Sequence, residues 1–155
     1  MRSFFQLFLF LTLTAPLFAQ TIEGSTESFA NNEPIANTEI AIIPEPVRLI
    51  KQTGHFILPQ NITIQVGKSP ELKQTIAFLQ QRLTVPTGYN VNVVNPPVAN
   101  ATIKLIINDT EDNTLGNEGY HLTVGAKQIT IRANKPAGVF YGVQSFIQLL
   151  PKEIE

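Results

Sequence analysis

The sequence contains no cysteine and no tryptophan, and it is poor in charge. Without cysteine the chain cannot form a disulfide framework, a thiolate metal site or a thiol nucleophile. Charged residues make up 15% of the 155 residues, against ~25% in a typical soluble domain, and the formal net charge is −1. This balance gives no electrostatic attraction to nucleic acid or to an anionic membrane, so neither is expected as a partner. The hydrophobic fraction of 43% is ordinary, and the chain can therefore bury the core of one domain.

The first 19 residues have the pattern of a secretory signal peptide. Arg2 precedes an apolar run over residues 4–13, and the segment Ala15-Pro16-Leu17-Phe18-Ala19 follows, after which we expect cleavage although Leu17 is not ideal there. The alternative is a membrane anchor, but Pro16 and scattered polar residues leave the run short of the ~20 residues needed to span a bilayer. We therefore expect a secreted or periplasmic protein with no membrane segment after cleavage.

Residues 20–40 differ in character from the rest of the chain. This stretch is rich in Ser, Thr, Asn and Glu, contains no Lys or Arg, and has neither helical nor alternating periodicity. Such composition is typical of a flexible linker. The folded domain is expected to occupy residues 41–151.

Short apolar segments separated by turn residues predict most of the strands. Residues 47–51 and 55–58 flank Gly54 and are expected to form a small hairpin, and residues 61–66 alternate between apolar and polar. Residues 119–124 and 127–133 flank Gly125-Ala126 and predict a second hairpin. Further strands are expected at 89–94 and 102–108, and the latter has the continuous apolar character of a central strand.

The sequence predicts two helices. The first follows Ser69, a candidate N-cap, and Pro70; its apolar residues recur at helical spacing until Pro86-Thr87-Gly88 ends it. That stripe comprises Leu72, Ile76, Leu79 and Leu83. The second helix is expected from Pro136 to Leu150, and it contains no charged residue. The two patterns together predict an α+β domain with a mixed sheet and two helices packed on one face.

The second helix has two distinct faces. One face is apolar and is expected to pack on the sheet; it comprises Val139, Val143, Phe146 and Leu150, with Phe140 and Ile147 beside it. The opposite face is polar but uncharged, whereas a helix facing water ordinarily carries Lys or Glu there. We therefore expect that another domain covers this face, unless it simply reflects the low charge of the whole protein. The predicted packing residues are Tyr141, Gln144, Ser145 and Gln148.

Candidates for catalysis, cofactor binding or metal binding are weak. Residues 109–113 resemble the start of a calcium loop, but Thr114 stands where Gly is required and Tyr120 where the bidentate Glu is required. His55 and His121 lie at no metal-ligand spacing and are expected in strands. Gly138 and Gly142 are expected to allow close backbone packing rather than to bind phosphate. No catalytic, cofactor or metal residue is predicted.

Three separated segments resemble one enzyme family. They are IIPEPVRLIKQTGHFIL from Ile42, LGNEGYHLTV from Leu115 and ITIRANKPAGVFYGVQSFIQLLP from Ile129. In this order they resemble the domain that precedes the catalytic barrel in glycoside hydrolase family 20, the β-N-acetylhexosaminidases. The resemblance spans residues 42–151.

The resemblance implies a zincin-like α+β fold without the zinc motif, and it places catalysis in a following (β/α)8 barrel. Family members use the substrate's acetamido oxygen as nucleophile, with an adjacent Asp-Glu pair in the barrel. Glu111 and Asp112 are adjacent in the reverse order and in a different domain, so they receive no catalytic role. A (β/α)8 barrel needs ~250 residues, more than this chain contains.

The leading hypothesis is therefore a non-catalytic N-terminal domain of a secreted β-N-acetylhexosaminidase, without cofactor. Its partner would be the catalytic barrel in cis, and the parent enzyme would act on glycans or chitooligosaccharides. Alternatives are a stand-alone carbohydrate-binding or structural module, or the front domain of another glycosidase family. The lack of tryptophan argues against a sugar-binding platform.

Overall fold

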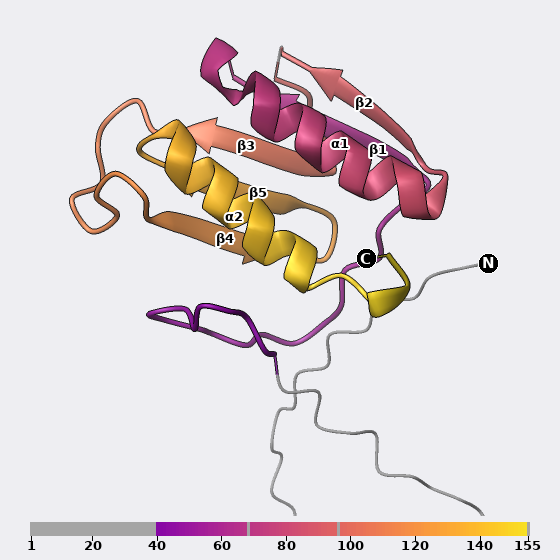
Figure 1. The fold of residues 1–155 in the computed structure, drawn as a ribbon, viewed down its shortest axis with the longest axis horizontal. Coiled ribbons are helices and arrows are strands. Elements are labelled where there is room, and N and C mark those ends of the chain that lie inside the picture. Colours follow the sequence, from indigo (N-terminus) through magenta and orange to yellow (C-terminus); the bar gives the residue numbers. More distant parts are fainter. Residues whose placement is uncertain (1–39, 68, 96, 155) are drawn as a thin grey trace, which may run out of the picture.

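The computed structural model describes residues 40–154, except residues 68 and 96. These residues form one mixed sheet of five strands in the order β2-β1-β3-β5-β4 (Figure 1). All neighbouring strands pair in parallel except β4 and β5, which are antiparallel. The strands are β1 (Asn61–Val66), β2 (Asn90–Val94), β3 (Ile103–Ile107), β4 (Tyr120–Val124) and β5 (Ile129–Ala133). The predicted signal peptide and nearly all of the predicted linker lie outside the described residues.

Two helices cover one face of this sheet (Figure 1). The 3-10 turn η1 (Pro70–Leu72) leads into α1 (Lys73–Thr87), and α2 (Pro136–Gln148) follows β5. A last 3-10 turn, η2 (Lys152–Ile154), contacts α1. The α+β class, the mixed sheet and the single helical layer are thus confirmed, and β3 is the central strand as predicted. No helix among the described residues is long and apolar enough to cross a bilayer.

The core lies between the sheet and the helices. Alternation in β1 directs Ile62, Ile64 and Val66 toward the helices, where each is at most 1% exposed. The α1 stripe meets them: Leu72, Leu79 and Leu83 are fully buried and Ile76 is half-buried. The other face of the sheet carries polar and charged side chains. Only one face of the sheet is therefore part of the core.

The ends of α1 differ in detail from the sequence prediction. The Ser69 side chain makes no capping hydrogen bond; instead its backbone oxygen accepts from Leu72 N at 3.1 Å, which produces the 3-10 turn. Pro86 lies inside the last turn of α1, and the helix ends at Gly88, whose φ is 69°. Gly88 N donates to Thr84 O at 2.8 Å. The left-handed glycine, rather than the proline, therefore ends the helix.

The first predicted hairpin is wrong. Residues 47–58 contain no strand, and His55 is accordingly not a strand residue, whereas His121 lies in β4. A two-stranded hairpin is barely stable by itself, and here Phe56 and Leu58 become 4% and 6% exposed by entering the main core. Burial of these two side chains thus overrides the local strand pattern.

The second hairpin and the end of α2 also need correction. The turn between β4 and β5 spans four residues, since Val124 pairs with Ile129 and Gly125 N donates to Gln128 O at 2.9 Å. α2 ends at Gln148 rather than Leu150, because the amides of residues 149 and 150 bond three residues back in 3-10 fashion.

Candidate functional site

The side of α2 that faces β4 and β5 is built from small residues. A Cβ on Gly138 would overlap the backbone oxygen of Gly119, and one on Gly142 would overlap Cγ2 of Ile131. Glycine therefore lets the helix backbone lie directly on the sheet. The prediction of close backbone packing at these two glycines is confirmed.

Close packing also buries a residue that the sequence placed on the opposite face of α2. Ser145 is 4% exposed, and its hydroxyl lies 2.5 Å from the hydroxyl of Tyr120 in β4. Because the two glycines let α2 lie close to the sheet, a larger part of the helix surface is buried, and this part includes Ser145. This serine therefore packs within the domain, which corrects the expectation that another domain covers it.

Gln148 holds the N-terminal segment of the domain. Its Oε1 accepts from Ile43 N at 2.8 Å, and its Nε2 donates to Ile43 O at 3.0 Å. The side-chain amide thus satisfies both backbone groups of one residue, as a neighbouring strand would. This role within the domain was not predicted, since the two residues lie 105 positions apart.

An aromatic row connects the two helices. It consists of Phe78 of α1 and Phe140 and Tyr141 of α2, with both ring-centroid distances at 5.9 Å. Phe140 and Tyr141 are 36% and 44% exposed, so Phe140 is less buried than the sequence predicted. Gln144 is half-buried on the same helix. The row gives the helical layer an uncharged outer surface along α2.

The acidic loop between β3 and β4 is organised by hydrogen bonds to Asn134. This buried amide accepts from Asp112 N and Asn108 Nδ2, both at 2.8 Å. It also donates to the backbone oxygens of Asp112 at 2.8 Å and Gly116 at 3.0 Å. All the capacity that a side-chain amide ordinarily uses is therefore occupied. The loop has a structural anchor that the sequence pattern did not reveal.

Two carboxylates of this loop, those of Glu111 and Asp112, are engaged with protein groups. Asp112 Oδ1 accepts from the hydroxyl and the backbone amide of Thr114, and these bonds, with a smaller contribution from His121, lower the pKa of Asp112. A hydrogen bond from Lys135 lowers the pKa of Glu111. Among the described residues, no group of three or more His, Asp or Glu side chains is placed to hold a metal ion.

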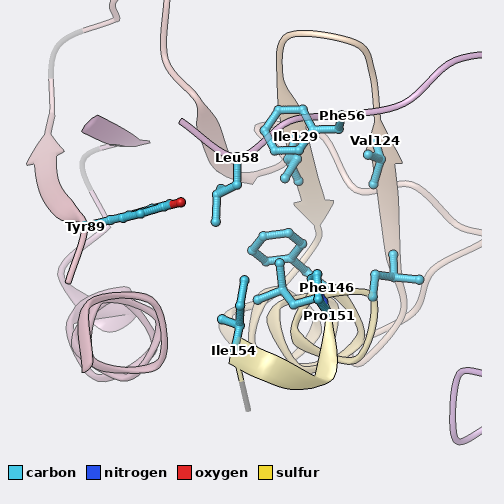
Figure 2. A pocket seen from close by; sticks show the side chains of 10 residues that line it. Phe56, Leu58, Tyr89, Val124, Ile129, Phe146, Pro151 and Ile154 are labelled. Atoms are coloured by element: carbon cyan, nitrogen blue, oxygen red, sulfur yellow. The ribbon is translucent and has the colours of Figure 1, made fainter. Parts of the chain in front are cut away.

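One pocket near the C-terminal end of α2 is apolar and small. Its wall includes Phe56 and Leu58 of the N-terminal segment, Phe146 of α2 and Ile154 of η2 (Figure 2). Its volume is about 20 Å³, which is scarcely more than one water molecule requires. In Figure 2 the Tyr89 hydroxyl points toward Leu58. This pocket is a packing defect of the core and is too small for a substrate.

Residues 39–155 match the sequence model of glycosyl hydrolase family 20, domain 2. The chain belongs to this family. The family 20 chain is 30% identical over 118 residues to the β-hexosaminidase of Porphyromonas gingivalis, covering 75% of the chain and 15% of the relative. It is 25% identical over 132 residues to the lacto-N-biosidase of Bifidobacterium bifidum, covering 85% of the chain and 12% of the relative.

Solved structures show the same relationship. The N-acetyl-β-hexosaminidase of Streptomyces plicatus superposes with a TM-score of 0.58 at 33% identity, over 64% of this chain and 19% of that one. The β-N-acetylhexosaminidase of Bacteroides fragilis gives a TM-score of 0.56 at 26% identity, over 71% and 21%. The family 20 chain thus corresponds to one domain of much longer enzymes, and the alternative of a front domain from another glycosidase family is set aside.

Proposed function

We propose that this chain is the non-catalytic domain of an exported β-N-acetylhexosaminidase, acting beside a catalytic barrel. The parent enzyme would remove terminal N-acetylhexosamine residues from glycans by substrate-assisted catalysis. The observation that carries the proposal is the extent of the match, which spans 75% of this chain but 15% of the Porphyromonas gingivalis enzyme. Export to the periplasm or the medium is part of the proposal and is supported by the signal-like first 19 residues.

The acidic residues of the domain support a non-catalytic role. Glycosidases need carboxyl groups that face a substrate cleft. Glu111 and Asp112 instead bond to Lys135 and Thr114 in a surface loop. In the parent enzyme the Asp-Glu pair would come from the barrel, and this domain would supply no reacting group.

The two faces of the domain suggest which one meets the barrel. The open face of the sheet carries Lys104, Arg132 and His121, each directed away from the helices by strand alternation. The exposed side of α2 carries Phe140 and Tyr141, and the helix has no charged residue. Because charged residues are depleted and aromatic residues enriched at interface cores, we assign the exposed side of α2 as the docking face. Tyr141 and Gln144 remain its predicted contact residues.

The docking face predicts self-association when the domain is isolated. The chain, expressed with its own export signal, should show a sedimentation coefficient that rises with concentration, because exposed aromatic side chains pair with one another. Tyr141→Lys should reduce this rise by placing a charge within the row. Val47→Lys is the matched control, since Val47 is also an exposed apolar residue but belongs to the N-terminal segment and not to α2. Strictly monomeric behaviour of the unmodified chain at high concentration would contradict the assignment.

A stand-alone carbohydrate-binding module remains the second candidate. The observation that favours it is a polar hollow at the start of β1 and β2, beside Asn61 and Asn90. Such a module would bind sugar without any barrel, whereas a domain of a hydrolase needs the barrel for its biological activity.

A further inference from the structure

A polar hollow of about 330 Å³ lies where β1 and β2 begin. The two strands are parallel neighbours with Asn61 opposite Asn90, and α1 is the crossover that connects them. The C-terminal end of α1 therefore returns beside the first residues of both strands (Figure 1). The hollow is lined by Gln60, Asn61, Thr87, Gly88, Tyr89 and Asn90.

The lining of the hollow is mostly polar and contains no charged side chain. Asn90 Nδ2 donates to Asn61 Oδ1 at 3.2 Å, which fixes the two exposed amides side by side. Each amide has two donors and an oxygen with two lone pairs, so the pair keeps both donors and acceptors free for a ligand. Thr87 is already engaged, because its hydroxyl donates to Leu83 O and accepts from Tyr89 N. Recognition would therefore rest on the two asparagines.

The backbone also leaves open space at Gly88. Gly88 adopts φ 69° as the cap of α1, and no atom lies within 4 Å of the position that a Cβ would occupy there. The hollow falls at the lower end of the ~300–1,000 Å³ range of small-molecule sites. Its size suits one sugar ring rather than a longer oligosaccharide.

We propose that this hollow binds a single neutral sugar residue. A sugar ring presents adjacent hydroxyl groups that both donate and accept, and the paired amides present the complementary groups. The uncharged lining disfavours a metal ion or a phosphate, and its polarity disfavours an apolar ligand. The site lies in the non-catalytic domain, and the proposal is independent of any hydrolytic activity. With two amides as its main contacts, the site should bind in the millimolar range.

The test is an NMR titration with N-acetylglucosamine. The protein is the ¹⁵N-labelled chain, purified after export by its expression host. The expected result is saturable chemical-shift change at the Asn61 and Asn90 side-chain amides and at the Gly88 backbone amide. Asn90→Ala should weaken binding about tenfold, because it removes one hydrogen-bonding partner and releases the other. Asn92→Ala is the matched control: it is an exposed asparagine of the same strand, two residues further on, and outside the lining.

Two results would overturn the proposal. One is the absence of saturable shifts in these three groups at tens of millimolar sugar. The other is an equal loss of affinity in Asn90→Ala and Asn92→Ala, which would place binding elsewhere on the sheet. Retention of the dispersed amide spectrum in both variants shows that they fold, so lost binding in Asn90→Ala reports on the site itself.

Discussion

Gly138→Ala is expected to lower the free energy of unfolding by about 3 kcal/mol or more, at the upper end of the range for overpacked cores. The added Cβ would overlap the Gly119 carbonyl oxygen and lie 2.8 Å from Cβ of Ala133. The first obstacle is backbone and the second a methyl that cannot rotate away, so α2 must move off the sheet. The better helix propensity of alanine returns only about 1 kcal/mol. Urea unfolding measures the difference.

The matched control for this substitution is Gly67→Ala. Its Cβ would meet no atom within 4 Å, and its φ is not in the left-handed region. Replacing a glycine of this kind by alanine raises the free energy of unfolding by about 0.4–1 kcal/mol, because it lowers the conformational entropy of the unfolded chain. If Gly138→Ala unfolded at the same urea concentration as the unmodified chain, close packing of α2 on β4 and β5 would not be a requirement of this fold.

Asn134→Ala is expected to cost about 3 kcal/mol, because four part-buried hydrogen bonds are lost and a polar group costs about 1–3 kcal/mol wherever water cannot replace its partner. The amide side chain makes four hydrogen bonds to Asn108, Asp112 and Gly116. Their loss should release the loop between β3 and β4 before the sheet unfolds. Hydrogen exchange at the Asp112 amide should accelerate more than exchange in β3 or β5.

Asn117→Ala is the control for Asn134, since Asn117 is exposed in the same loop. It should change stability by less than about 0.5 kcal/mol. A loss below about 1 kcal/mol for Asn134→Ala, with unchanged exchange at Asp112, would show that water replaces the side chain without difficulty. The loop would then be held by its neighbours rather than by this amide.

The parts of the fold that follow from neighbouring residues could be predicted from the sequence. Alternation at 61–66 identifies β1 and its buried side, and the spacing of Leu72, Leu79 and Leu83 identifies the buried side of α1. The apolar run of β3 places it in the centre of the sheet. Each of these patterns reports burial on one face of a single element, which is what periodicity encodes.

The parts that depend on distant residues could not be predicted. The irregular course of residues 47–58 results from burial of Phe56 and Leu58 in a core formed by later elements. Ser145 is buried because Tyr120 reaches it from another strand, and Gln148 is engaged by a residue 105 positions away. Helical geometry placed both residues on a polar face but could not show that this same domain already contacts them.

The central proposal is that the chain is a non-catalytic domain of a hydrolase. The most direct measurement is the rate at which the purified chain releases nitrophenol from p-nitrophenyl N-acetyl-β-glucosaminide. We predict a rate equal to that of a heat-denatured sample, because Glu111 and Asp112 are engaged in a surface loop and face no substrate cleft. Saturable turnover that Asp112→Asn abolishes would contradict the account, because the chain would then contain its own catalytic carboxylate.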